Sequence, residues 1–201
     1  MRAIVPEGLA PPAAVPADVF AAAMECYSEG RRLDMQALAR ELGMARATLY
    51  RRVGNREQLL DDVVWFRSRR ALVDAVQHTG SLHGVPRLVA MVAAIMRAVE
   101  ADGALRAFLE TDPEAAMRIL TGARSTVQRG MISALEAVID LETQRGHYRA
   151  RVDTPTLAYA IVRVSEGFLY ADIIADREPD VDRALAIVEA LLTGLDTNRA
   201  N

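Results

Sequence analysis

The sequence predicts an all-α protein, with a small N-terminal domain of three helices followed by a larger helical domain. Hydrophobic residues make up 51% of the chain and aromatic residues only 5%, so most of the core is aliphatic and Ala-rich, which favours helices. Apolar residues recur at helical spacing, and no stretch alternates apolar and polar residues as a half-buried strand would. Helix caps and helix breakers separate these stretches.

The N-terminal elements follow from these caps and breakers. Residues 1–16 are rich in Pro and Ala and predict a mobile arm. A first helix spans 18–30. Asp34 can cap a second helix, which ends at Gly43. A short third helix follows over 46–53, which completes the three-helix domain.

The larger domain begins beyond a fourth helix. Gly54 breaks the chain and Asn55 caps this helix, which is predicted over 56–77. Residues 78–86 contain two Gly and one Pro and predict a linker. The remaining apolar patterns predict five further helices, over 86–101, 105–110, 113–144, 156–175 and 180–198.

The segment Met35–Val53, MQALARELGMARATLYRRV, has the features of a helix-turn-helix. Ala39 is small enough for two helices to cross closely, and Gly43 permits the turn. Residues 40–56 contain five Arg and one acid, Glu41, a local charge of +4. A short cationic helix that exposes hydroxyl groups fits the major groove of DNA. Two short polar helices also occur in ordinary helical bundles, so the turn alone leaves that structural alternative open.

The longer segment MQALARELGMARATLYRRVGNREQLL resembles the signature of the TetR family. Thr48-Leu49-Tyr50 is followed at once by Asn55-Arg56-Glu57-Gln58-Leu59, in the family's order and spacing. The resemblance implies a helix-turn-helix DNA-binding domain over 17–65 and an effector-binding and dimerisation domain over 66–198. It also implies a homodimeric transcriptional regulator, most often a repressor, that binds double-stranded operator DNA and a small-molecule effector.

The family implies roles for individual residues of the DNA-binding domain. Thr48, Tyr50 and Arg56 would contact phosphates. Arg46 and Arg51 are our candidates for reading base edges, because Arg pairs bidentately with guanine, and Arg52 would meet the backbone. The full set expected at the DNA interface is Arg46, Ala47, Thr48, Tyr50, Arg51, Arg52, Asn55 and Arg56.

Two positions depart from the family pattern. Ala45 stands where Ser or Thr is usual, so the third helix should lack its side-chain cap and one phosphate contact. Val53 stands where Phe is usual, which is a small loss of core volume.

The last two long helices carry apolar stripes that predict a dimer interface of four helices, two from each chain. Gly167 would allow close approach. The alternative is that the stripes face the core of the monomer. The predicted interface residues are Leu157, Ile161, Val164, Phe168, Val181, Leu185, Val188, Leu192 and Leu195.

An adaptable effector cavity is predicted from the 8 Met residues and from polar side chains on otherwise apolar helices. Arg163 and Glu166 would either meet the polar head of a ligand or form a salt bridge with each other. Similarity to the QsdR-like actinobacterial subgroup, which regulates lactone degradation, implies an acyl lactone or a related amphipathic effector. The candidate ligand-binding residues are Met91, Ile95, Met117, Leu120, Met131, Tyr159, Arg163, Glu166 and Tyr170.

Composition argues against an enzyme and against a cofactor. All 24 basic residues are Arg, so Walker, Schiff-base and general-base lysines are absent. His78, His83 and His147 are too scattered in the sequence to indicate a metal site, and Cys26 is expected to be a small buried hydrophobe. A single cysteine fits the reducing cytoplasm, and no signal sequence or membrane span is recognisable. The alternative function is a helical dimeric module that binds a ligand or protein without DNA.

Overall fold

The computed structural model describes residues 15–200, with the side chains of 199 and 200 left aside. Within this range the only β-type pairing is an isolated bridge between Ala150 and Asp196, so the predicted all-α class is confirmed for the described residues. The helices are α1 (Ala17–Ser28), α2 (Met35–Glu41), α3 (Arg46–Val53), α4 (Arg56–His78), α5 (Gly84–Glu100), α6 (Gly103–Thr111), α7 (Pro113–Thr121), α8 (Thr126–Gln144), α9 (Thr154–Ile174) and α10 (Val181–Leu195), followed by the 3-10 turn η1 (Thr197–Ala200).

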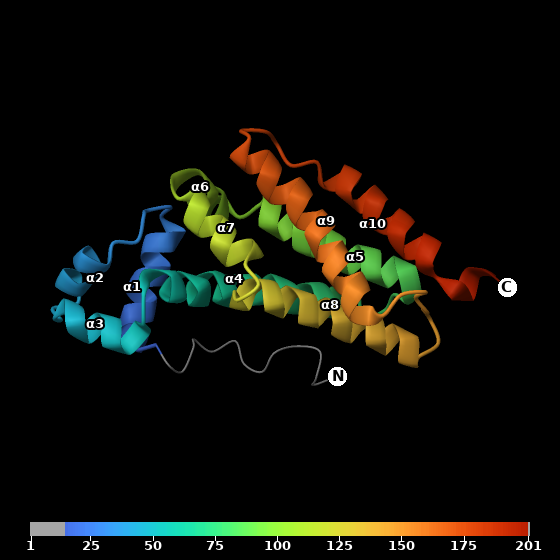
Figure 1. Cartoon of the computed structure of the whole chain (residues 1–201), viewed down its shortest axis with the longest axis horizontal. Coiled ribbons are helices and arrows are strands. Elements are labelled where there is room, and N and C mark those ends of the chain that lie inside the picture. Colours follow the sequence, from blue (N-terminus) through green and yellow to red (C-terminus); the bar gives the residue numbers. More distant parts are fainter. Residues whose placement is uncertain (1–14, 201) are drawn as a thin grey trace.

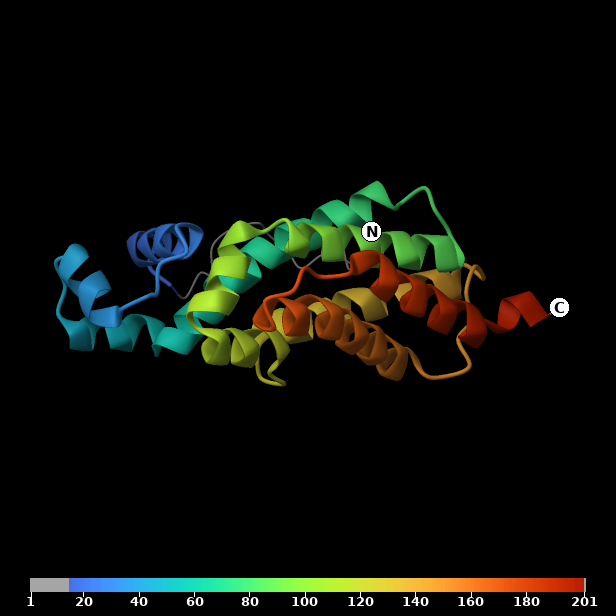
Figure 2. The same cartoon turned by 90° about the horizontal axis from the view of Figure 1, so that it is seen from above.

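The helices form an elongated molecule with a small head at one end (Figures 1 and 2). Helices α1, α2 and α3 and the first turns of α4 make the head. Helices α5 and α8 pack along the rest of α4, and α9 and α10 lie against α5 and α8, so that the five helices make the body. The short helices α6 and α7 lie where head and body meet.

Helix α4 joins the two parts without a break. The predicted domain boundary between residues 65 and 66 falls inside this helix, so head and body share one rigid element. The predicted linker over 78–86 is shorter than expected, because α5 already begins at Gly84.

One predicted helix is two helices in the structure. The apolar pattern over 113–144 suggested a single element, but α7 ends at Thr121 and α8 begins at Thr126. Gly122 leaves the helical conformation with ψ of 133°, and the Ser125 hydroxyl accepts from the backbone N–H of Val127 at 3.0 Å, which caps α8. Both flanking segments keep helical periodicity, so the pattern alone did not reveal the break.

The core of the head is formed by apolar residues on one face of α1 and of α2. Val19, Ala23 and Leu38 are at most 3% exposed, and Cys26 is buried as expected. Phe20 packs edge-on against Phe66 of α4 with ring centroids 5.2 Å apart. The head therefore folds onto the first half of α4.

The predicted arm over 1–16 lies outside the described residues except for its last two positions. Of these, Val15 is buried, and Pro16 precedes the first turn of α1. Among the described residues, no helix has both the length and the apolar character needed to cross a membrane.

Candidate nucleic-acid interface and internal cavity

The helix-turn-helix is built by local contacts at its caps and turn. The Asp34 carboxylate accepts from the backbone N–H groups of Gln36 at 2.7 Å and Ala37 at 3.0 Å, which starts α2. Gly43 has a φ of +61°, a conformation that costs a glycine little and other residues more. Leu49 and Val53 are buried, so they fix α3 to the head and orient its opposite face outward.

The outward face of α3 gathers the predicted contact residues on one cationic surface. Arg46, Ala47, Arg51 and Arg52 are exposed. Thr48 and Tyr50 are half-buried beside them. The Arg46 guanidinium lies 5.3 Å from the centre of the Tyr50 ring, a cation–π contact one turn apart. Helix α3 contains three Arg and no acid, so its surface attracts phosphate.

Position 45 behaves as the sequence indicated. Ala45 is the N-cap of α3 and supplies no side-chain hydrogen bond to the first turn. The N–H groups at the start of this helix are therefore not satisfied by the cap residue, and they can meet a phosphate directly.

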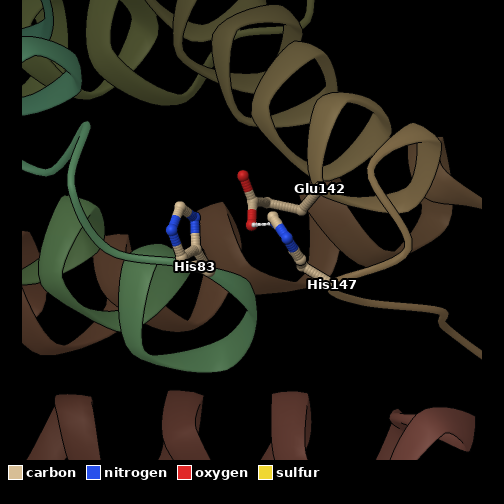
Figure 3. A group of neighbouring side chains, drawn as sticks. All are labelled: His83, Glu142 and His147. Carbon is tan, nitrogen blue, oxygen red and sulfur yellow. Dashed lines mark hydrogen bonds and ion pairs between the residues drawn. The ribbon is translucent and has the colours of Figure 1, made fainter.

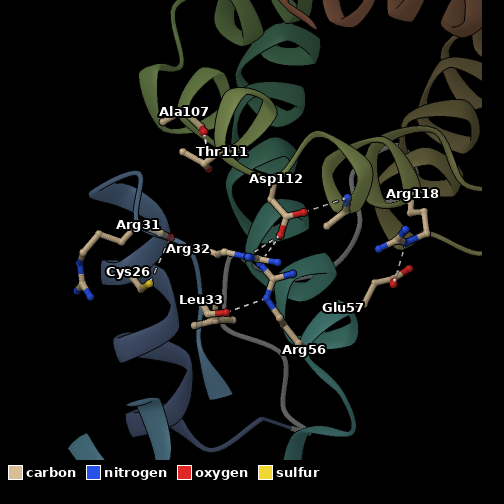
Figure 4. Close-up of polar contacts among 11 residues, drawn as sticks. Cys26, Arg31, Arg32, Leu33, Arg56, Glu57, Ala107, Thr111, Asp112 and Arg118 are labelled. Carbon is tan, nitrogen blue, oxygen red and sulfur yellow. Dashed lines mark hydrogen bonds and ion pairs between the residues drawn. The ribbon is translucent and has the colours of Figure 1, made fainter. Parts of the chain in front are cut away.

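The two remaining predicted contact residues have partners inside the protein. Asn55 caps α4 through a capping box: its Oδ1 accepts from the Gln58 N–H at 2.9 Å, and its own N–H donates to Gln58 Oε1 at 2.9 Å. Arg56 turns toward the body, where its Nε donates to the Leu33 carbonyl at 2.7 Å and its Nη2 lies 2.7 Å from Asp112 Oδ2 (Figure 4).

Asp112 is the centre of the junction between head and body. It caps α7 and forms ion pairs with Arg56 at 2.7 Å and with Arg32 at 3.4 Å (Figure 4). Burial alone would raise the pKa of the Asp112 carboxyl, but contact with Arg56 holds it below its usual value. This carboxylate is therefore charged at neutral pH and ties α7 to the start of α4.

Two further contacts join α4 to the body beside Asp112. Glu57 pairs with Arg118 of α7 at 3.2 Å (Figure 4). Asp61 accepts from the Ser125 hydroxyl at 2.8 Å and from the Thr126 N–H at 2.9 Å, at the start of α8. The junction is therefore held by ion pairs and hydrogen bonds, in contrast to the apolar cores on either side.

An internal cavity of about 70 Å³ lies in the body. Its wall is mostly apolar and includes three Met residues, and its polar groups come from α9. The lining residues are Met91, Val92, Ile95, Met96, Val99, Leu120, Val127, Met131, Leu135, Ile161, Val162, Ser165, Glu166, Leu169 and Tyr170.

Glu166 is the one carboxylate in this wall, and it has two protein partners. Its Oε2 accepts from Arg163 at 2.8 Å and its Oε1 from the Gln128 amide at 3.3 Å. Burial raises the pKa of the Glu166 carboxyl, while Arg163 and Gln128 oppose that rise. Burial also raises the pKa of Tyr170, whose ring lies in the same wall.

The structure brings six of the nine candidate ligand-binding residues to this cavity: Met91, Ile95, Leu120, Met131, Glu166 and Tyr170. Met117, Tyr159 and Arg163 lie outside it. Arg163 stacks on Tyr159 at 5.1 Å and donates to the Thr121 carbonyl at 3.1 Å. Of the two alternatives for Arg163 and Glu166, the structure shows the salt bridge. Glu166 also lines the cavity, and its contact with the polar head of a ligand stays a prediction.

The predicted interface residues divide into two groups. Leu157, Ile161, Val181, Val188 and Leu192 are at most 4% exposed within one protomer. They belong to the protomer's own core, because α9 and α10 turn these side chains toward α5 and α8. Val164, Phe168, Leu185 and Leu195 are only partly buried.

An apolar outer face remains on α9 and α10 beyond those residues. Tyr159, Ile174 and Ile187 are 49%, 45% and 50% exposed. Gly167 and Gly194 point into open space, since a Cβ at either would meet nothing within 4 Å. Small and apolar groups on two adjacent helices form a surface that a second pair of helices can approach closely.

The sequence prediction missed two residues that matter at these sites. Gln128 is 2% exposed and supports Glu166 from α8, and its only signal was a polar residue between the apolar positions Val127 and Met131. Asp112 stands directly before Pro113 in the sequence and received no predicted role. Its pairing with Arg56 depends on how α7 meets the head, which no local pattern records.

Comparison with known protein families gives a match for most of the body. The model of the tetracyclin repressor-like C-terminal domain matches residues 83–193, which is more than half of the chain. No curated protein sequence matches the chain.

Solved structures resemble the whole molecule. The repressor QsdR of the TetR family from R. erythropolis is 27% identical, with a TM-score of 0.78 over 89% of this chain and 96% of that one. The regulator FadR from Bacillus subtilis, solved with stearoyl-CoA, is 15% identical, with a TM-score of 0.61 over 89% and 98%. The second likeness bears on the fold alone.

Proposed function

This chain belongs to the TetR family of transcriptional regulators, and we propose that it is a homodimeric repressor that a small amphipathic effector releases from its operator. The observation that carries the proposal is a continuous set of contacts from the cavity to the head. Leu120 of α7 lines the cavity, and Asp112 at the start of the same helix grips Arg56 at the start of α4. Operator binding places the protein in the cytoplasm.

Operator binding is assigned to the outer face of α3. Arg46 and Arg51 read base edges in the major groove, while Thr48, Tyr50 and Arg52 contact phosphates. Stacking on Tyr50 limits the freedom of Arg46 before DNA arrives, which lowers the entropic cost of ordering it. Arg56 keeps its partner Asp112 and acts in transmission rather than as a primary phosphate contact.

The cavity wall favours an effector with an apolar tail and an uncharged polar head. Glu166 offers a hydrogen-bond acceptor and Tyr170 a hydroxyl donor, while the carboxylate would repel an acidic head. An acyl lactone with an amide N–H and several carbonyl groups meets these requirements.

Effector entry must enlarge the cavity. A volume of about 70 Å³ holds only a few water molecules, whereas ligand pockets usually measure about 300–1,000 Å³. Met91, Met96 and Met131 have unbranched side chains that can repack around a tail. The expansion would push on α7 through Leu120 and on Arg163, which holds the carbonyl of Thr121 at the end of α7.

Movement of α7 would then reach the DNA through Asp112. A shift of this carboxylate pulls on Arg56 and Arg32 and reorients the head about the start of α4. In a dimer the two heads must match successive major grooves, so a small rotation of each lowers operator affinity.

The dimer is assigned to the outer face of α9 and α10. Regulators of this family act as dimers, and Gly167 and Gly194 leave room for a partner's helices. Val164, Phe168 and Ile187 would supply the apolar contact area. Burying this face would remove the exposed side chains of Tyr159, Ile174 and Ile187 from water.

A two-stage binding experiment tests the proposal. Genomic fragments are selected on the full-length protein, and the operator is footprinted. Acyl homoserine lactones of increasing chain length are then titrated into the complex, with free fatty acids of the same lengths as controls. We expect release by a lactone and none by the matched acid. Absence of duplex binding at low salt would favour the helical binding module without DNA. Release by the acids alone would overturn the effector assignment.

A further inference from the structure

Two histidines that are far apart in the sequence meet beside a buried carboxylate at the end of the body (Figure 3). His83 precedes α5, Glu142 lies in the last turn of α8, and His147 follows that helix. The ring centres of His83 and His147 are 4.4 Å apart, and His147 Nδ1 lies 3.3 Å from Glu142 Oε2. One ligand atom from each residue can be chosen so that all three lie within 4.8 Å of one another.

The backbone around the three side chains is held in place. Gly84 donates its N–H to Glu142 Oε2 at 2.6 Å. Gly84 also has a φ of +58°, and a Cβ there would lie 2.6 Å from the carbonyl oxygen of His147. The segment that carries His83 and the turn that carries His147 therefore touch through their backbones. Their imidazole rings are brought together by this contact and not by chance rotamers.

The carboxylate is also fixed, with one oxygen turned toward the histidines. Arg87 donates to Glu142 Oε1 at 2.6 Å, and Glu142 is fully buried. This pair keeps Glu142 ionised and leaves Oε2 facing the imidazoles. Both histidines are exposed, so an ion can reach the cluster from solvent.

We propose that His83, His147 and Glu142 bind one divalent transition-metal ion of the zinc class. Two imidazole nitrogens and one carboxylate oxygen are typical zinc ligands, and water would complete the coordination. Bonds of about 2.1 Å to a tetrahedral ion place its ligand atoms about 3.4 Å apart, so small rotations of the exposed rings close the site. Magnesium and calcium prefer oxygen ligands and do not fit this set.

The bound ion would tie the α4–α5 connection to the α8–α9 connection. Both connections lie at the end of the molecule opposite α3 (Figure 1), so the site is distinct from the DNA surface. None of the three residues lines the cavity. Its effect would be to stabilise the body, because the ion binds the folded arrangement of two loops that unfolding separates.

Isothermal titration of the tag-free, chelator-treated full-length protein tests the proposal directly. We expect saturation at one Zn²⁺ per chain, a rise in Tm with Zn²⁺, and no heat or Tm change with Mg²⁺. Replacement by Co²⁺ should give the visible absorption of a nitrogen- and oxygen-bound ion. His83→Ala and His147→Ala should each weaken zinc binding more than about 100-fold. Loss of a residue that only hydrogen-bonds to a metal ligand already lowers metal affinity about 10- to 100-fold.

His78→Ala is the matched control. His78 is exposed like the other two, but its Nδ1 contacts the Asp74 carbonyl within α4. This variant should bind zinc as the unaltered protein does, and circular dichroism in chelator should show that all variants are folded. Absence of saturable binding at millimolar Zn²⁺ would overturn the proposal, as would equal affinity in a His83→Ala/His147→Ala double variant.

Discussion

Asp112 holds Arg56 across the junction between the head and the body, with 2.7 Å between the carboxylate Oδ2 and the guanidinium Nη2. Each residue is also anchored on its own side. Asp112 caps α7, and Arg56 donates to the Leu33 carbonyl in the head. In the proposed mechanism this pair would carry a displacement of α7 to the helix-turn-helix.

Asp112→Asn should weaken both stability and effector response. The change leaves Arg56 without a charged partner in a partly buried place, which costs about 1–3 kcal/mol in the free energy of unfolding. In operator-binding assays, the factor by which an effector weakens DNA binding should fall toward one, from about 5- to 150-fold for a typical allosteric coupling. Chemical denaturation and gel-shift titration measure the two effects.

Asp182→Asn is the control for Asp112. It removes an ion pair of the same 2.7 Å length, to Arg97, but Asp182 is 82% exposed and lies on α10, outside the contacts of Asp112. Its effect should stay within about 0.5 kcal/mol. Equal losses in the two variants would contradict a special role for the junction.

Arg46→Ala and Tyr50→Phe should separate sequence preference from affinity. Loss of a bidentate base contact by Arg46 costs about 1–3 kcal/mol on the operator and little on random duplex. Tyr50→Phe keeps the ring but removes the hydroxyl, so it weakens binding to all duplexes alike. Competition titrations on operator and random DNA compare them. Equal losses on both DNAs for both variants would contradict these roles.

Gly167→Leu should dissociate the dimer without unfolding the protomer. A side chain at Gly167 meets nothing within one protomer, and replacing a helical glycine gains up to about 1 kcal/mol in helix propensity. In the proposed interface the same side chain collides with the partner, so dimer affinity should fall at least about tenfold. Light scattering after size exclusion measures the state. Gly103→Leu, equally open but on α6, should remain dimeric.

Gly130→Ala should destabilise the body although it improves helix propensity. A Cβ at Gly130 would lie 2.1 Å from the Trp65 ring, so α8 and α4 would have to separate or the indole would have to turn. Overpacking of this kind costs about 1–3 kcal/mol. Urea denaturation measures it against Gly103→Ala, which should be neutral or stabilising. A stabilised Gly130→Ala variant would mean that Trp65 moves freely.

Glu166→Gln should change how stability depends on pH. Burial raises the pKa of Glu166 above its usual 4.5, so the folded protein binds this proton more tightly than the unfolded chain. The stability contributed by this bound proton is fully present below pH 4.5, and it is lost as the pH rises through the pKa of Glu166 in the folded protein. The Gln side chain does not titrate, so the variant does not lose this stability. Its stability relative to the unaltered protein should therefore increase between pH 4.5 and neutrality. Measuring the Tm of both proteins across that pH window tests the prediction. A Tm difference between them that does not change with pH would contradict it.

Local sequence signals determined the head almost completely. The cap at Asp34, the turn at Gly43 and the capping box at Asn55 act within four residues, so the three helices could be predicted from the chain alone. The first of them ends at Ser28, two residues before the predicted end at residue 30. The exposed cationic face of α3 followed from the same spacing. The break between α7 and α8 escaped prediction because Gly122 and Ser125 interrupt a pattern that is helical on both sides.

By itself the sequence also determined the class of protein, through the T-L-Y helix that runs into the Asn55-capped helix. Only the tertiary structure decided which apolar stripe is core and which is surface. Leu157 and Tyr159 both lie on α9, and the packing of the other helices covers the first and leaves the second exposed. It also decided that Arg56 meets Asp112 and that His83 meets His147. Such pairs join distant segments through the packing of whole helices, and no local spacing carries that information.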